Sequence, residues 1–200
     1  LSATVRRDGL SIWAPGKKFA TFPSASIGWR IDQEHFMAAV KQISELKVRV
    51  GYGETGLNAV GIFPPINIDL PLNNDYPWQV NVQANGSTYP FNNTNSPGNG
   101  SYYNALSNPD LEWEKTKQLN IGLDLGLFEN KITLSAEYYR RKTDNLILNV
   151  PTPTSFGFNG TGIFANVASM QNNGFEIQAT YNQNKGPFTW NLTGNISSIR

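Results

Sequence analysis

In the stretch Gln118-Leu119-Asn120-Ile121-Gly122-Leu123-Asp124-Leu125-Gly126-Leu127, every second residue is apolar. Successive side chains of a β-strand point to opposite sides, so this spacing predicts a strand with one apolar and one polar face. We therefore predict an extended strand here.

The same alternation recurs along the chain and predicts an all-β, antiparallel protein. It is found again at residues 46–52, 132–138, 175–181 and 188–196. Segments 1–7 and 19–31 also have extended character, which brings the expected total to about seven strands. Short polar turns at Phe128–Lys131 and Asn184–Pro187 join neighbouring strands into hairpins.

Strand length and loop asymmetry favour a membrane barrel. Several runs approach the ~9–11 residues that a tilted strand needs to cross a bilayer. The connections 55–116 and 142–172 are predicted to be long and to face the cell exterior, whereas the tight turns face the periplasm. Asp32–Glu45, with apolar residues at roughly helical spacing, predicts one short periplasmic helix.

Composition excludes several other classes of protein. Hydrophobic residues make up 39% of the chain, the mean hydropathy is −0.39, and no apolar run approaches the ~20 residues of a membrane helix. Cysteine is absent, which excludes disulfides and thiolate metal sites. The net charge of +1 gives no electrostatic reason to bind nucleic acid. The aromatic content of 12% suits strands, interfacial girdles and sugar-stacking surfaces.

Several short sequence blocks stand out along the chain. They are Arg7-Asp8-Gly9, Phe22-Pro23-Ser24-Ala25-Ser26-Ile27-Gly28-Trp29-Arg30-Ile31, Leu46–Gly56 (LKVRVGYGETG), Asn108–Thr116 (NPDLEWEKT), Asn120-Ile121-Gly122-Leu123-Asp124, Tyr138–Leu146 (YYRRKTDNL) and Asn172-Asn173-Gly174-Phe175-Glu176. Together they resemble the signatures of SusC/RagA-type TonB-dependent outer-membrane transporters. Asn173 stands where the family usually has Lys. The blocks occur in the family's order and leave out only the segment 57–106, which limits what can be said of the cargo.

The resemblance implies a much larger protein with an N-terminal extension, a plug domain and a barrel of about 22 strands. Residues 1–200 would then be one part of the C-terminal half of that barrel, without the plug or the extension. Leu1 is not an initiator Met and Arg200 lies in an alternating run, which agrees with this expectation. The resemblance further implies a SusD-like lipoprotein partner, the TonB-ExbB-ExbD complex, outer-membrane lipid and an oligosaccharide or peptide cargo.

Two groups of candidate site residues follow, both for binding and neither for catalysis. The polar stripe supplies candidates that would face the barrel lumen, where they contact plug or cargo or, more often, satisfy one another across strands: Arg49, Asn120, Asp124, Glu137 and Glu176. The long outer loop supplies aromatic candidates that would stack on sugars, meet the lid protein or pack the loop on itself: Trp78, Tyr89, Phe91, Tyr102 and Tyr103.

Other conspicuous residues have structural explanations. Trp29, Tyr52 and Trp190 are predicted girdle aromatics near strand ends, and Trp113 and Glu114 are expected to fix the return of the long loop to its strand. His35 is expected to be solvated. The acidic stretch 69–75 offers oxygen ligands for calcium but lacks the spacing of a known calcium loop.

The competing hypothesis is a secreted, soluble β-sandwich that acts as a carbohydrate-binding or adhesin domain. Such a domain would also alternate apolar and polar residues, but its strands would be shorter and would enclose a sealed core. An enzyme is not expected, because no nucleophile–base pair, metal cluster or phosphate loop has a convincing context, and no cofactor is predicted.

Overall fold

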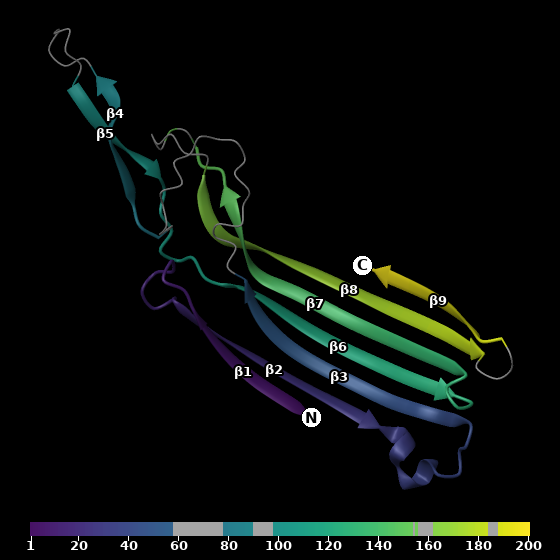
Figure 1. The fold of residues 1–200 in the computed structure, drawn as a ribbon. Helices are drawn as coiled ribbons and strands as arrows, with labels where there is room; N and C mark the ends of the chain where they lie inside the picture. The colour runs from purple at the N-terminus through teal and green to yellow at the C-terminus, as the bar shows by residue number, and fades with distance from the viewer. Residues whose placement is uncertain (58–77, 90–97, 154, 156–161, 184–187) are drawn as a thin grey trace.

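Seven strands form one antiparallel sheet in the order β1-β2-β3-β6-β7-β8-β9. The computed structural model describes residues 1–57, 78–89, 98–153, 155, 162–183 and 188–200. The strands of the sheet are β1 (Ser2–Gly9), β2 (Phe19–Arg30), β3 (Ile43–Leu57), β6 (Glu114–Leu127), β7 (Ile132–Val150), β8 (Ile163–Gln183) and β9 (Trp190–Ile199). They make one long, curved layer with β1 and β9 at its two edges (Figure 1). The expected all-β, antiparallel fold of about seven strands is confirmed.

A separate two-stranded hairpin of β4 (Asn81–Tyr89) and β5 (Gly98–Ala105) projects beyond one end of this layer (Figure 1). It belongs to the segment 55–116 that was expected to form a long connection. The β6–β7 turn and the β2–β3 connection lie at the opposite end of the sheet (Figure 1). In the described ranges, no helix has the length and apolar character required to cross a bilayer.

The register of the sheet sorts its side chains onto two faces. Leu123 of β6 lies opposite Val48 of β3 and Ala136 of β7, whereas Asp124 lies opposite Lys47 and Ser135. Because directly opposed residues share a side of the sheet, the apolar positions of successive strands coincide. We call the side of Leu123 the apolar face and the side of Asp124 the polar face.

Large hydrophobic side chains are exposed along the apolar face. Its exposed members include Ile27, Trp29, Tyr52, Ile121, Leu123, Tyr138, Phe175, Ile177, Trp190, Leu192 and Ile196. Nothing in the described part of the chain forms a second layer over them. A β-sandwich would bury such a face between two sheets, so the sandwich alternative is wrong in its architecture. An exposed apolar area of this extent needs lipid or a partner to cover it.

The predicted helix over Asp32–Glu45 is wrong. The chain instead forms two short 3₁₀ helices, η1 (Ile31–Gln33) and η2 (His35–Met37), and β3 already begins at Ile43. Phe36 is 65% exposed, so the apolar side of a longer helix would have nothing to pack against. Short helices depend on such packing, and without it the segment keeps only single turns.

Asp32 organises this connection. Its carboxylate accepts hydrogen bonds from the Arg30 guanidinium (2.7 Å), the Gln33 amide (2.7 Å) and the backbone N–H of Leu46 (3.2 Å). The hydrogen bond from Arg30, followed by that from Gln33, holds the pKa of Asp32 well below its usual range. The contact with Leu46 ties the turn to the start of β3.

The connection predicted over 142–172 is also much shorter than expected. β7 continues to Val150 and β8 starts at Ile163. The register shifts between Thr143 and Ile147, where Asn145 has a φ of 61°, which marks a bulge. Because the bulge breaks the alternation of apolar and polar residues, periodicity could not reveal these strand extensions.

The only sizeable core among the described residues lies where the strands approach the long connections. Trp13, Ala20, Phe22, Leu111, Trp113 and Ile147 form it. Ala20 and Phe22 alternate in phase with Ser24 and Ser26, so they project from the polar face of β2. Trp113 packs edge-on against Phe22 at 5.9 Å between ring centroids. The chain between β1 and β2 therefore folds back onto the polar side of the sheet.

Candidate lumen-facing site

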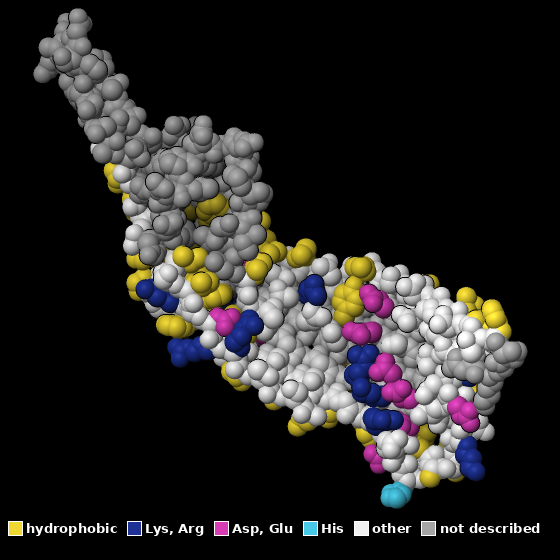
Figure 2. All heavy atoms as spheres, viewed as in Figure 1, with side chains coloured by type: hydrophobic (Ala, Val, Ile, Leu, Met, Phe, Trp, Pro, Cys, Tyr) yellow, Lys and Arg dark blue, Asp and Glu magenta, His cyan; other side chains and the backbone are white. Residues whose placement is uncertain are grey.

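Three strands bring opposite charges together near the middle of the polar face. Arg49 of β3 donates from Nε to a carboxylate oxygen of Asp124 on β6 (2.8 Å), and its Nη2 lies 3.6 Å from Glu137 of β7. Ser135 donates a further hydrogen bond to Asp124 (2.9 Å). Figure 2 shows positive and negative side chains gathered in one band over this part of the sheet. Two carboxylates thus lie around one guanidinium, and Lys47 lies opposite Asp124 on the same face.

Gly122 makes this arrangement possible. It lies directly between Arg49 and Glu137 in the register. A Cβ added there would come within 2.9 Å of the Arg49 guanidinium carbon, so any larger residue would push the side chain away. The glycine allows the guanidinium to lie across β6 and to reach both neighbouring strands.

The other predicted polar residues lie on the same face but outside the cluster. Asn120 accepts a hydrogen bond from the side chain of Gln118 (2.9 Å), two residues earlier on the same strand and face. Glu176 of β8 lies directly opposite Glu137, and both line a hollow of about 400 Å³ together with Gln178 and Asn195. Two opposed carboxylates repel each other, so this hollow favours a positively charged or hydrogen-bond-donating group.

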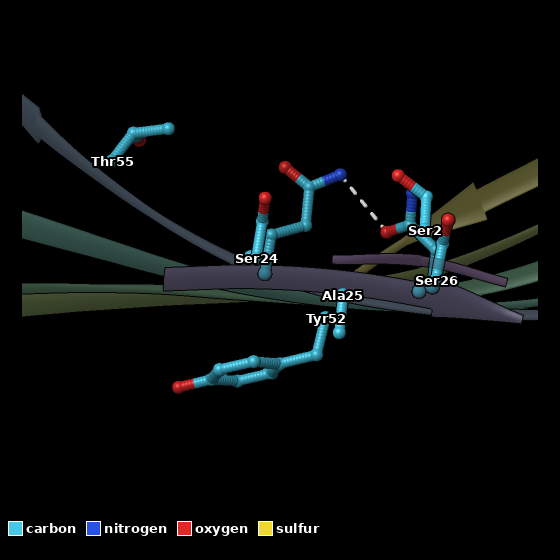
Figure 3. A pocket seen from close by; sticks show the side chains of 10 residues that line it. Ser2, Ser24, Ala25, Ser26, Tyr52 and Thr55 are labelled. Atoms are coloured by element: carbon cyan, nitrogen blue, oxygen red, sulfur yellow. Dashed lines mark hydrogen bonds between the residues drawn. The ribbon is translucent and has the colours of Figure 1, made fainter. Parts of the chain in front are cut away.

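A second hollow of about 310 Å³ lies over β2 and β3. In Figure 3, Ser2, Ser24, Ser26 and Thr55 point to one side of the sheet, whereas Ala25 and Tyr52 point to the other. The hydroxyls share this side with the Gln118–Asn120 hydrogen bond. Because these side chains are small and polar, this part of the polar face leaves room for a solute or another part of the protein to lie against it.

Most of the predicted aromatic site falls on residues whose side chains are not among those the structure describes. Trp78 is half-buried and lies just before β4, and Phe91 lies outside the described residues. Tyr89, Tyr102 and Tyr103 are described only by backbone pairing, with Gly98, Gln83 and Val82 respectively. Their role as ligand or lid contacts stays a prediction.

The predicted girdle aromatics all lie on the apolar face. Trp29 and Trp190 are at strand ends, and Trp29 donates from its indole nitrogen to Glu34 (2.8 Å). Trp190 packs against Tyr181 with ring centroids 5.2 Å apart. Tyr52 is not near a strand end, because β3 extends to Leu57, and its hydroxyl donates to Glu54 (2.7 Å).

Trp113 and Glu114 are buried where the long connection returns to the sheet. A carboxylate oxygen of Glu114 accepts a hydrogen bond from the backbone N–H of Ile147 (2.8 Å), and the Trp113 indole donates to the Lys17 carbonyl (3.2 Å). These contacts tie three distant segments together and support the structural role expected for both residues. His35 lies exposed on η2.

Sequence reasoning missed Ser135, Gln118 and Gly122 as parts of the polar site. Each occupies a polar-face position of an alternating strand, so the period of two could have placed it on the correct side. Which strand lies next to which is decided only by the register. Among the described residues no three His, Asp or Glu side chains gather into a metal site, and the stretch 69–75 lies outside them.

An antiparallel sheet with one exposed apolar face and one polar face is the arrangement found in the wall of a membrane β-barrel. A family model described as "TonB dependent receptor-like, beta-barrel" matches residues 1–199. The chain belongs to this family and is of the SusC/RagA type, as its sequence blocks predict.

Individual relatives agree with this placement. The chain is 35% identical to the TonB-dependent receptor SusC of Bacteroides thetaiotaomicron over 97% of its length, and 33% identical to the TonB-dependent receptor P39 of Formosa agariphila over 98%. It matches 18% and 17% of these proteins. In the RagAB peptide importer, 99% of the chain superposes on 20% of one chain of the closed-closed state, with a TM-score of 0.76 and 25% identity. The chain thus spans about a fifth of the length of its relatives.

Proposed function

We propose that residues 1–200 form part of the barrel wall of a TonB-dependent importer in the outer membrane of a Bacteroidetes-type bacterium. The observation that carries the proposal is the exposed apolar face, continuous over neighbouring strands, opposite a face that is polar throughout its centre. In water such a face would promote aggregation, whereas in a bilayer the hydrocarbon chains of the lipid cover it. The polar face then lines the lumen.

The lumen-facing residues would meet a plug domain or a passing cargo. The Arg49–Asp124–Glu137 cluster and the paired carboxylates Glu137 and Glu176 offer charge to such a partner. The plug, the N-terminal extension and the contact with TonB-ExbB-ExbD would belong to the longer protein. Transport of this kind is binding and gating rather than bond chemistry.

The cargo would be an oligosaccharide or a peptide, captured with a SusD-like surface lipoprotein. The similarity to the RagAB peptide importer supports a peptide. An oligosaccharide is the alternative that the resemblance of the sequence blocks implies. The connections beyond β3 and β7 would face this partner from the cell exterior. Uptake of a panel of labelled peptides and oligosaccharides, compared between a deletion strain and its complemented parent, would identify the cargo class.

Depth-dependent quenching tests the membrane placement itself. Single cysteines carrying a fluorophore would replace Leu123 or Ile177 on the apolar face and Asp124 or Gln178 on the polar face of the intact receptor in lipid vesicles. We expect bromine-labelled acyl chains to quench the first pair and not the second. Equal quenching of both pairs, or none, would refute the proposal.

A further inference from the structure

A cluster of positive side chains lies on the apolar face, directly beyond its hydrophobic run. On β6, Lys115 and Lys117 precede Leu119 in phase with it, and on β7, Arg140 and Lys142 follow Tyr138 in phase. We call these four residues the basic patch. The patch lies toward the end of the sheet where the long connections emerge, which is the exterior under the proposed orientation (Figure 1).

The strand register concentrates the charge of the basic patch. Lys117 and Lys142 lie directly opposite each other, an arrangement that repulsion between like charges makes unfavourable on its own. Asp144 reduces this repulsion by forming ion pairs with both lysines. Its carboxylate lies 2.8 Å from Lys142 Nζ and 3.8 Å from Lys117 Nζ. Arg140 donates to the side-chain oxygen of Gln171, which is neutral (2.9 Å).

The carboxylates around the patch do not neutralise it. Glu54 lies opposite Lys117 in the register and accepts a hydrogen bond from the Tyr52 hydroxyl. The four positive charges of the patch and the two negative charges of Glu54 and Asp144 leave a net charge of +2. Among the described residues, Lys115 has no carboxylate within ion-pair distance. Lys117 and Lys142 keep 44% and 45% of their side chains exposed. The patch therefore has charge and surface available for an anion.

The bulge in β7 opens a hollow next to these lysines. Lys115, Lys117, Asp144, Asn145, Asn166 and Ser169 contribute to the lining of its volume of about 520 Å³. Asn166 fixes one wall, since its side-chain nitrogen donates to the carbonyls of Glu112 (3.0 Å) and Asn145 (2.7 Å) and its oxygen accepts the Glu112 N–H (2.9 Å). Ammonium and hydroxyl donors thus border a hollow with an ordered wall.

We propose that the basic patch and this hollow bind the phosphate groups of an anionic outer-leaflet lipid of the lipid A type. The proposal rests on the proposed barrel function, because it places the patch where the hydrocarbon ends and head groups begin. Continuity with the apolar run would let the acyl chains of one lipid lie on Ile121 and Tyr138 while its phosphate meets the lysines. Ammonium and guanidinium groups form short, charge-assisted hydrogen bonds with phosphate.

The test uses the intact receptor that carries this segment, purified in detergent and titrated with diphosphoryl lipid A while native mass spectrometry counts the bound lipid. The double variant Lys117→Gln/Lys142→Gln is expected to bind lipid A about tenfold more weakly than the wild type. The conservative variant Lys117→Arg/Lys142→Arg keeps the charge and is expected to restore binding. Retention of heat-modifiable gel mobility would verify that each variant is folded.

Arg141→Gln is the matched control. Arg141 neighbours Arg140 and Lys142 on β7 but lies on the polar face, where it donates to Gln118 (3.1 Å). The Arg141→Gln substitution removes one positive charge from the same strand but leaves the basic patch unchanged, so lipid A binding should equal that of the wild type. Equal loss in this control, or no loss in the double variant, would overturn the proposal.

Two further arms separate the lipid from a free anion and from failure of the barrel proposal. Millimolar inorganic phosphate should not displace lipid A, and displacement would show a site for free phosphate instead. Lipid A stripped of its phosphates should bind no better to the wild type than to the double variant. If acyl-chain quenching at Leu123 is observed but lipid A binding ignores the patch, this inference alone fails and the barrel function stands.

Discussion

Two parts of the same strands differ in what covers them. Along β6, β7 and β8 the central part exposes apolar side chains on one face and polar ones on the other, and its sequence alternates strictly. Toward the long connections the apolar face becomes charged at Lys117 and Arg140, while the polar side acquires the core around Trp13 and Trp113. Backbone pairing therefore continues through both parts of the strands, whereas the pattern of side chains changes with what covers each part.

The largest effect should come from the core of the strand extensions. Trp113→Ala removes a 6%-exposed indole that packs on Trp13 and Phe22, and such truncations cost about 3–5 kcal/mol. We expect the loss to be local, with faster amide hydrogen exchange around Leu111 and Ile147 and unchanged exchange at Leu123. Trp113→Phe should recover most of the protection. Equal loss of protection at Leu123 would show that the two parts unfold as one unit.

The next effect separates the two faces of the central part. Ile177→Arg and Gln178→Arg place the same charge on neighbouring positions of β8 but on opposite faces. A charge facing hydrocarbon costs about 2–4 kcal/mol, whereas the polar side should tolerate it within about 0.5 kcal/mol. Urea unfolding of the intact receptor in lipid vesicles measures both variants. Similar unfolding free energies for the two variants would show that the two faces are not in different environments.

A smaller effect tests how the long connection is anchored. Glu114→Ala leaves the buried Ile147 N–H without its acceptor, at a cost of about 1–3 kcal/mol. Glu114→Gln keeps an acceptor oxygen and should stay near the wild type, which identifies the hydrogen bond rather than the charge as the stabilising feature. Hydrogen exchange at Ile147 reports the contact directly. No difference between the two variants would contradict this role.

The smallest effect concerns pH at the opposite end of the sheet. Because hydrogen bonds to the carboxylate lower the pKa of Asp32, its contribution to stability is present above the ordinary carboxyl pKa of about 4 and is lost as the pH falls through the lowered value. Asp32→Asn should therefore be less stable than the wild type at neutral pH, and the gap should close in acid. Thermal unfolding at several pH values measures this. If the difference in stability between the wild type and Asp32→Asn did not change with pH, protonation of Asp32 would not be coupled to folding.

The sequence predicted more of the central sheet than of its ends. Alternation placed Leu119–Leu127 and Phe175–Tyr181 in strands and assigned their faces correctly, because a half-covered strand must repeat every two residues. It failed for the extensions of β7 and β8, where the bulge at Asn145 shifts the phase. It also overestimated the helix after Asp32, since spacing alone does not reveal that Phe36 has nothing to pack on.

The strand pattern, the two faces and the family can be predicted from local spacing and short motifs. Which residues of different strands lie next to each other depends on the pairing of the strands in three dimensions. Arg49, Asp124 and Glu137 lie far apart in the chain, and Lys117 meets Lys142 only because β6 pairs with β7 in one register. That register depends on turns, bulges and packing across the whole sheet, and a shift of one residue would send each side chain to the other face.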